Sequence, residues 1–204
     1  MKPALVILCG GNSLRMGTDK ALLPFGEECL LEYLVHKFSS DFGKIYLSVT
    51  HRGDYAHLNL DVTEIPDIYH DVGPLGGILS SLSMITEDRA FFISLETPFL
   101  SPSLCLHLYE ASENYDAATF DLRNDYTGIV AATYSKKCLS AFGSSIVFKQ
   151  NISSKLNEKC MVKTISFEEA ASWATLPIEE EFYRLTDRDS YYFALFKLLN
   201  IQSK

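Results

Sequence analysis

One short segment near the start of the chain carries the residue types that bind phosphate. It follows directly on an apolar run and reads Leu8-Cys9-Gly10-Gly11-Asn12-Ser13-Leu14-Arg15-Met16-Gly17-Thr18-Asp19-Lys20-Ala21-Leu22-Leu23-Pro24. Adjacent glycines let the backbone turn sharply and approach a ligand with no Cβ in the way. Backbone N–H groups can then donate to phosphate oxygens, and Arg15 and Lys20 supply positive charge. This spacing favours a phosphate-binding loop over a plain strand-to-helix turn with two solvated cations.

The loop differs from two familiar phosphate-binding sequences. A P-loop requires G-x-x-x-x-G-K-[ST], whereas Gly17 is followed by Thr18 and Asp19 before Lys20 appears. A dinucleotide fingerprint requires G-x-G-x-x-G, which residues 10–15 do not supply. The segment therefore indicates another kind of nucleotide site.

Further polar residues follow the next apolar runs along the chain. Ser48 and Thr50 lie at the end of the second run, Asp67 follows the third, and Glu96 follows the fourth. Ligands of open α/β sheets bind outside the carboxyl ends of the strands. We therefore expect these residues to converge with the glycine loop on one crevice.

The elements that must position these residues alternate between apolar runs and helical spacing. The expected strands are 4–9, 44–50, 62–65, 90–95, 116–120, 129–134 and 161–165, and the expected helices are 29–38, 75–85, 103–113 and 187–199. This alternation predicts an α/β fold, a Rossmann-like three-layer sandwich whose mostly parallel sheet has helices on both faces. Residues 121–128 are polar and turn-rich, which favours an antiparallel return. With no linker, repeat or low-complexity tract, the chain is expected to form a single domain, residues 1–204.

Composition excludes several classes of protein. The chain has 204 residues, 47% of them hydrophobic, which suffices for one substantial core. Its net charge of −8 argues against a general nucleic-acid binder. The five scattered cysteines form no C-x-x-C pair, and this favours reduced thiols in a cytoplasmic protein. No apolar run approaches the roughly 20 residues of a membrane span.

Three segments resemble motifs of the MobA family, within the nucleotidyltransferase superfamily. Residues 8–24 resemble the signature L-A-G-G-x-S-x-R-M-G-x-D-K-A-L-L-P, with Cys9 in the place of its alanine. Residues 67–78 resemble D-x(5)-G-P-L-x-G-I, and residues 95–100 resemble C-D-x-P-F-L with Glu96 in the place of the aspartate. The resemblance covers nearly the whole chain and is strongest over residues 4–40 and 62–104.

This resemblance implies a nucleotidyltransferase-like fold and a specific reaction. The implied enzyme is a Mg²⁺-dependent molybdenum cofactor guanylyltransferase, which transfers GMP from GTP to molybdenum-bound molybdopterin and releases pyrophosphate. Arg15 and Lys20 would then be catalytic, and Glu96 would hold Mg²⁺. The implied nucleotide-binding residues are Leu8, Cys9, Gly10, Gly11, Lys20, Ser48, Asp67 and Glu96. Besides GTP and molybdopterin, the implied partners are molybdoenzymes or cofactor-delivery proteins.

Two departures from the family pattern leave alternatives open. Glu96 is one methylene longer than the family aspartate, and Tyr183 and Leu185 stand where the family's C-terminal N-x-N-T-P-E-D segment has asparagines. One alternative is another nucleotidyltransferase, acting on CTP and a pterin or on a sugar phosphate; Gly10-Gly11 and the short spacing from Arg15 to Lys20 count against it. The other is a nucleotide-binding protein of the same fold that has lost catalysis.

Overall fold

The computed structural model describes residues 2–10, 17–121, 127–149 and 151–202. Its centre is a seven-stranded sheet with the order β5-β4-β1-β6-β8-β7-β9. The strands are β1 (Ala4–Leu8), β4 (Lys44–Val49), β5 (Thr63–Pro66), β6 (Arg89–Ser94), β7 (Ala117–Phe120), β8 (Ala132–Ser135) and β9 (Val162–Ile165). Strands β5, β4, β1 and β6 are mutually parallel, whereas β8 runs antiparallel to both β6 and β7. The antiparallel return expected after residues 121–128 is therefore confirmed.

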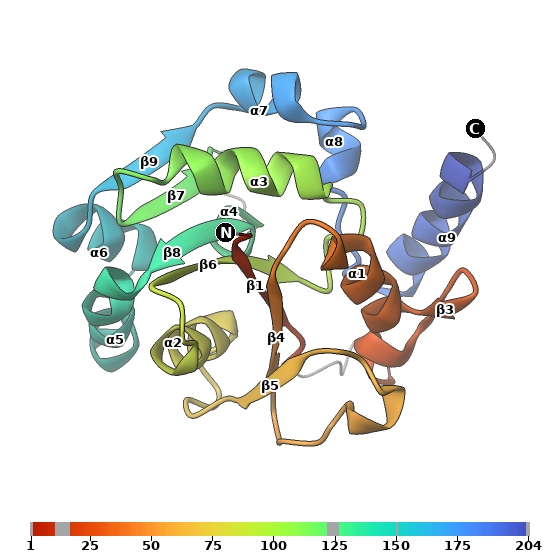
Figure 1. Ribbon diagram of the computed structural model, residues 1–204, viewed down its shortest axis with the longest axis horizontal. Helices are drawn as coiled ribbons and strands as arrows, with labels where there is room; N and C mark the ends of the chain where they lie inside the picture. The colour runs from red at the N-terminus through yellow and green to blue at the C-terminus, as the bar shows by residue number, and fades with distance from the viewer. Residues whose placement is uncertain (1, 11–16, 122–126, 150, 203–204) are drawn as a thin grey trace.

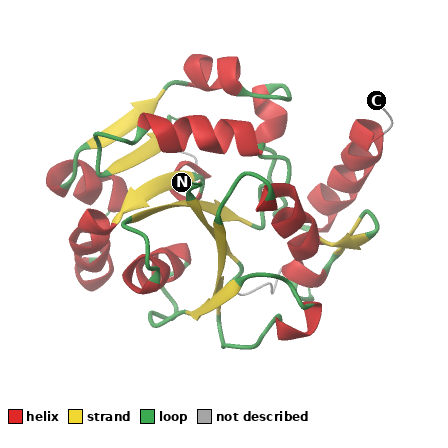
Figure 2. Ribbon diagram, viewed as in Figure 1, coloured by secondary structure: helices red, strands yellow, loops and turns green. Residues whose placement is uncertain are grey.

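Helices cover both faces of this sheet (Figures 1 and 2). They are α1 (Leu30–Ser39), α2 (Pro74–Met84), α3 (Pro102–Ala111), α4 (Thr127–Val130), α5 (Leu139–Phe148), α6 (Ile152–Lys159), α7 (Phe167–Trp173), α8 (Ile178–Glu181) and α9 (Arg188–Gln202). Successive side chains of a strand point to opposite faces. Accordingly, Leu5 and Ile7 of β1 join a core with α1, α3, α7, α8 and α9, while Val6 joins a second core with α2, α5 and α6. The expected three-layer α/β fold is confirmed.

Short elements complete the chain between the sheet and its helices. These are the hairpin β2 (Pro24–Phe25) and β3 (Glu28–Cys29), and the 3₁₀ turns η2 (Lys20–Leu22), η3 (Ala56–Leu58) and η4 (Lys136–Cys138). Helix α3 begins where the sequence predicts, because the Ser101 hydroxyl accepts from Leu104 N–H and proline occupies the first turn.

One expected strand is wrong over its first half. Residues 127–130 form the short helix α4, and β8 begins only at Ala132. The side chains of Val130 and Ala132 are both buried, so an apolar run alone does not separate a buried helical turn from a buried strand.

The register of the parallel strands aligns their carboxyl ends. Leu8 at the end of β1 pairs with Ser48 on one side and with Ser94 on the other. The strand order changes direction at β1, since the chain proceeds from β1 to β4 on one side and later to β6 on the other. Such a switch point is where open α/β sheets form their ligand crevice.

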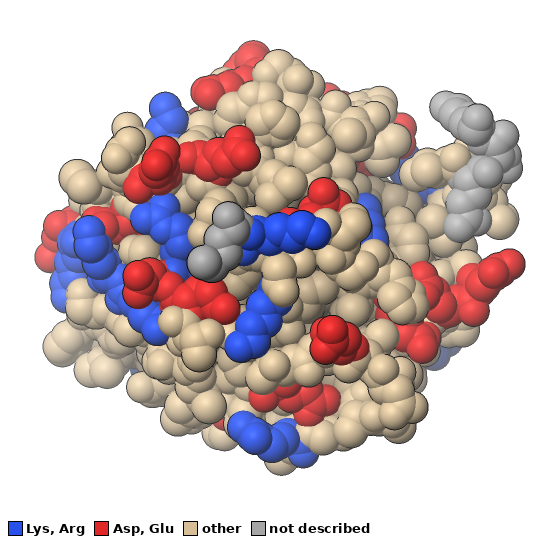
Figure 3. Space-filling model, in the orientation of Figure 1, with Lys and Arg blue, Asp and Glu red and all other residues tan. Residues whose placement is uncertain are grey.

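On the face drawn in Figure 3, acidic and basic side chains are interspersed, and neither sign of charge covers the whole face. None of the helices in the described ranges has the length and apolar character needed to cross a membrane.

Candidate active site

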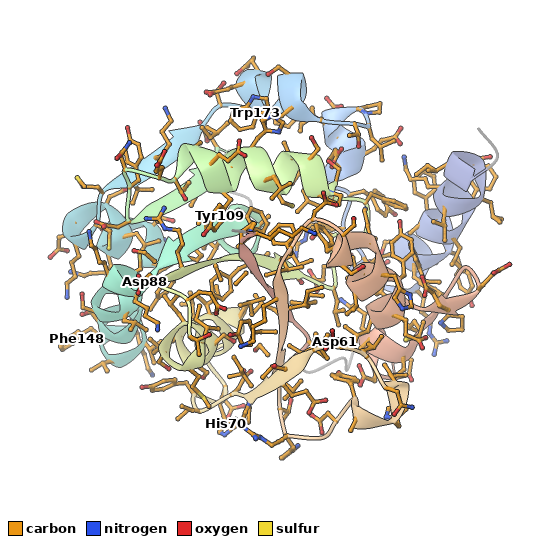
Figure 4. The ribbon with its side chains drawn as sticks, viewed as in Figure 1. Asp61, His70, Asp88, Tyr109, Phe148 and Trp173 are labelled. Carbon is orange, nitrogen blue, oxygen red and sulfur yellow. The ribbon has the colours of Figure 1, made fainter. Side chains whose placement is uncertain are left out.

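A cavity of about 480 Å³ opens at the carboxyl ends of β1, β4 and β5. This volume is within the range of small-molecule sites. Its wall is formed by Leu8, Gly10, Ser48, Thr50, Asp67, Tyr69, His70, Asp71, Gly73, Pro74 and Gly77. His70, labelled in Figure 4, lies on the segment that joins β5 to α2. The expected convergence of the first three strand ends on one crevice is thus observed, whereas Glu96, which follows the fourth strand, does not line this cavity.

A serine and an aspartate from neighbouring strands meet in this cavity. The Ser48 hydroxyl donates to Oδ1 of Asp67 at 2.6 Å. Burial raises the pKa of the Asp67 carboxyl, although the Ser48 hydrogen bond and the nearby His70 oppose the shift. Asp67 is therefore a partly desolvated acceptor facing a cavity, as a residue that binds donor groups of a ligand would be.

Two glycines make room for this pair. A Cβ on Gly10 would lie 2.7 Å from Oδ2 of Asp67, and a Cβ on Gly77 would lie 2.5 Å from the Ser48 hydroxyl oxygen. Both distances are shorter than nonbonded atoms tolerate, so any larger residue at either position displaces the pair. Glycines from two separate motifs are thus both needed for the Ser48–Asp67 hydrogen bond.

The start of the glycine loop is fixed to β4. The N–H groups of Cys9 and Gly10 both donate to the carbonyl oxygen of Ser48, at 2.9 and 3.0 Å. The Cys9 side chain is buried in the core, and burial raises the pKa of its thiol well above the ordinary value. The expected site residues Gly11 and Arg15 lie outside the described residues.

Lys20 and Glu96 form an ion pair between the glycine loop and the end of β6. Lys20 Nζ donates to Oε1 of Glu96 at 2.8 Å, and the side chains are 12% and 28% exposed. Asp19 holds the turn that carries Lys20, because its carboxylate accepts from Ala21 N–H and from the Tyr55 hydroxyl. Asp19 therefore orients the turn that carries Lys20.

The C-terminal segment contributes a cation to this pair that sequence reasoning missed. Arg184 donates from Nη2 to Oε2 of Glu96 at 2.7 Å. Its neighbour Leu185 is fully buried, donates its N–H to the Glu96 carbonyl at 2.8 Å and accepts from Lys20 Nζ at 2.8 Å. No local pattern in the sequence marks Arg184, since its role depends on a segment 88 residues away in the chain.

The two departures at residues 183 and 185 have a structural explanation. The Tyr183 hydroxyl donates to the Ser190 carbonyl, and its ring packs against Phe99 and Phe193. Leu185 faces the core and serves the site with its backbone. Both residues thus fix the segment that presents Arg184.

The charges around Glu96 determine its protonation. Burial acts to raise the pKa of this carboxyl, but the hydrogen bonds and charges of Lys20 and Arg184 outweigh it and hold the pKa below its usual value. Glu96 is therefore ionised at neutral pH.

The donor set suits a metal ion that arrives with its substrate. Within the described ranges, no three His, Cys, Asp or Glu side chains gather as a cation cage. Mg²⁺ commonly takes only one or two carboxylates and completes its shell with substrate phosphates and water. An ionised Glu96 supplies one such carboxylate.

A larger cavity, of about 610 Å³, lies between α1 and α3. Its wall contains no residue from the ends of β1, β4 or β5. Because Gly10, Ser48 and Asp67 line the smaller cavity at the strand ends, that cavity is the candidate active site.

The sheet order, the glycine loop and the ion pair at the strand ends define an α/β protein of the nucleotidyltransferase type. Solved structures agree with this class. Over 98% of both chains, the fold matches molybdopterin-guanine dinucleotide biosynthesis protein A from Archaeoglobus fulgidus, with a TM-score of 0.79 at 21% identity. It also matches 2-C-methyl-D-erythritol 4-phosphate cytidylyltransferase from Thermus thermophilus, with a TM-score of 0.69 at 13% identity over 98% of this chain and 100% of the other.

Sequence comparison narrows the class to a family. The family described as MobA-like NTP transferase domain matches residues 5–155, and the chain belongs to it. The chain is 32% identical to a probable molybdenum cofactor guanylyltransferase of Pelotomaculum thermopropionicum, over 69% of this chain and 67% of the relative. It is 27% identical to a protein of the same description from Carboxydothermus hydrogenoformans, over 97% of each chain.

Proposed function

We propose that this protein transfers GMP from GTP to the terminal phosphate of molybdenum-bound molybdopterin and releases pyrophosphate. Membership of the MobA-like family and the names of its relatives support the reaction. The single observation that carries the proposal is the position of the Lys20–Glu96 pair. It joins η2, at the end of the glycine loop, to the segment that follows β6, and β6 pairs with β1, whose end lines the cavity.

The cavity is proposed to hold the guanosine part of the nucleotide. Asp67 offers a carboxylate to ligand N–H or O–H donors, and Gly10 and Gly77 keep the approach to it open. Ser48 fixes that carboxylate through its 2.6 Å hydrogen bond. These residues bind and orient the nucleotide and take no part in bond making.

The reaction proposed needs no protein base. An oxygen of the acceptor phosphate forms a bond to the α-phosphorus of GTP, and the bond from that phosphorus to the departing pyrophosphate breaks. A phosphate monoester has a second pKa of about 6, so this oxygen is already ionised near neutrality. What remains for the protein is positioning and the stabilisation of negative charge, which Lys20 supplies.

Glu96 is proposed to hold Mg²⁺ together with phosphate oxygens of the nucleotide. The ion would neutralise charge on the reacting phosphates. The role of Glu96 is to orient the metal-bearing nucleotide against Lys20.

Two measurements on the full chain test the proposal. The first is thermal stabilisation by GTP, CTP, ATP and UTP, each with and without Mg²⁺. A ligand at 100 times its Kd adds about 2.7 kcal/mol to the stability. The second is pyrophosphate release from GTP with molybdopterin carrying molybdate as acceptor. We expect selective stabilisation by GTP with Mg²⁺ and acceptor-dependent release. Selective stabilisation by CTP would assign the chain to cytidylyl transfer, and nucleotide binding with no release would identify an inactive binder.

A further inference from the structure

Both oxygens of the Glu96 carboxylate are occupied by cationic side chains. Lys20 Nζ lies 2.8 Å from Oε1, and Arg184 Nη2 lies 2.7 Å from Oε2. A Mg²⁺ ion approaches a carboxylate oxygen to about 2.0–2.1 Å. A dication at that distance repels a guanidinium on the same carboxylate, so metal binding and the present Arg184 contact compete for Glu96.

The backbone that carries Arg184 is anchored, whereas its side chain is the more exposed of the two cations. Leu185 is buried and bonded through its N–H to the Glu96 carbonyl, and the Tyr183 hydroxyl is bonded to the Ser190 carbonyl. The Arg184 side chain is 29% exposed, against 12% for Lys20. Because Arg184 is the more exposed cation, we expect a rearrangement at Glu96 to move its side chain and to leave the backbone in place.

A substrate phosphate is the natural new partner for a displaced guanidinium. Arginine presents a planar set of N–H donors that matches phosphate oxygens as well as it matches a carboxylate. The anchored backbone keeps that side chain beside Glu96 and Lys20, where the phosphates of the proposed reaction lie.

We propose that Arg184 is a positioning residue that exchanges partners during substrate binding. It holds Glu96 in the ligand-free protein and moves to a substrate phosphate when a divalent cation takes Glu96. The inference rests on the proposed function for the place of the phosphates. It has two consequences: a divalent cation alone binds weakly, and Glu96 limits the affinity of the site for polyphosphate in the absence of metal.

The first test measures Mn²⁺ binding to the full chain by electron paramagnetic resonance, with no nucleotide present. We expect Arg184→Ala to tighten Mn²⁺ binding by about tenfold, because the competing cation is gone. Arg184→Lys keeps a cation at the position and should bind Mn²⁺ within about threefold of the unmutated chain. Unchanged or weaker binding by Arg184→Ala would overturn the exchange.

The second test is a double-mutant cycle on metal-free binding of inorganic tripolyphosphate, measured by calorimetry. Glu96→Gln releases both Arg184 and Lys20 and should tighten tripolyphosphate binding by about tenfold. In an Arg184→Ala background, the same substitution releases Lys20 alone, and the gain should be at least about threefold smaller. Equal gains in both backgrounds would show that Glu96 acts by its charge alone and would overturn the proposal.

Neither test uses GTP, molybdopterin or turnover, so the two proposals fail separately. A chain that shows the exchange but transfers no GMP refutes only the proposed reaction. A chain that transfers GMP but shows no exchange refutes only the role of Arg184. Melting curves of each variant show whether it is folded, and Arg184→Lys supplies a cation-retaining comparison if Arg184→Ala is not.

Discussion

Ser48 donates its hydroxyl to Asp67 at 2.6 Å, joining the ends of two neighbouring parallel strands in the wall of the cavity at the strand ends. The contact depends on the absence of side chains at Gly10 and Gly77. The hydrogen bond between Ser48 and Asp67 thus requires glycine at two positions that are far apart in the sequence, one after β1 and one in helix α2.

Gly77→Ala tests this requirement. The new Cβ would lie 2.5 Å from the Ser48 hydroxyl oxygen and 3.2 Å from Leu8 Cδ2. We expect a loss of roughly 1–3 kcal/mol of stability from overpacking, together with weaker nucleotide binding. The matched control is Gly143→Ala in α5, where a Cβ meets no atom within 4 Å. That substitution should stabilise the helix by up to about 1 kcal/mol. Equal effects of the two substitutions in urea unfolding would contradict the packing argument.

Asp67→Asn should change the pH dependence of stability. Burial raises the pKa of Asp67, so the folded protein binds this proton more tightly than the unfolded chain does. Protonation therefore stabilises the fold, and that contribution is lost as the pH rises through the raised pKa. Asparagine does not ionise. The stability of the variant relative to the unmutated chain should increase between about pH 3.5 and pH 7.

The control for this prediction is Asp61→Asn, an exposed aspartate just before β5. Denaturant titrations over this pH range measure the effect of Asp67→Asn. A flat profile would mean that the Asp67 carboxylate is solvated. Nucleotide affinity at pH 7 should fall in Asp67→Asn and stay unchanged in Asp61→Asn.

Most of the parallel half of the sheet is predictable from the sequence. Each of its strands is a short apolar run followed by turn residues, and the observed ends of β1, β4, β5 and β6 differ from the expected ends by one residue. The run at residues 129–134 misleads, because Val130 at the end of α4 and the side chains of β8 are all buried. Burial on every side removes the periodicity that distinguishes a helix from a strand.

Site residues at the ends of strands can be predicted from the sequence. Site residues that a distant segment of the chain contributes cannot. Ser48 and Asp67 follow from their positions, near the end of β4 and directly after β5. Arg184 does not, because it reaches Glu96 from the segment before α9, and that segment is placed by the burial of Leu185. Long-range packing of this kind leaves no periodic signal in the sequence.

Lys20→Ala should lower turnover by about 100-fold or more, since it removes the cation aimed at the phosphates. It also leaves the Leu185 carbonyl without a donor that it has in this structure. A stability loss of about 1 kcal/mol should accompany the loss of activity. Steady-state pyrophosphate release and thermal melting measure the two effects.

Lys155→Ala is the matched control, because it removes a lysine–glutamate pair with Glu158 on α6, away from the strand ends. Its turnover should equal that of the unmutated chain. If Lys20→Ala keeps full turnover and loses only stability, Lys20 is a structural residue and the loop does not bind the reacting phosphates.

Glu96→Gln should abolish metal-dependent turnover, with a loss of about 100-fold or more at any Mg²⁺ concentration. The amide keeps the size of the side chain but removes the negative charge that binds the cation.

The stability of Glu96→Gln should also change with pH. The lowered pKa of Glu96 means that its ionised form stabilises the fold above the ordinary glutamate pKa, and that this contribution is lost as the pH falls through the lowered value. The variant should therefore be less stable than the unmutated chain at pH 7 and approach it in acid. Full turnover in Glu96→Gln would place the metal elsewhere.

Glu96→Asp should retain or increase turnover and reach half-maximal rate at a lower Mg²⁺ concentration. Aspartate keeps the charge but is one methylene shorter, so one carboxylate no longer spans both Lys20 and Arg184 at their present 2.8 and 2.7 Å. Lys20 keeps its contact with the Leu185 carbonyl, and we expect the more exposed Arg184 side chain to lose its contact with residue 96. A carboxylate released from Arg184 offers the metal an oxygen without competition.

The measurement is pyrophosphate release from GTP with the molybdopterin acceptor over a series of Mg²⁺ concentrations. If the unmutated chain releases no pyrophosphate and Glu96→Asp does, the longer glutamate side chain has abolished the activity. Removing one methylene then restores it. If Glu96→Asp fails as completely as Glu96→Gln, the site requires the reach of glutamate and not merely its charge.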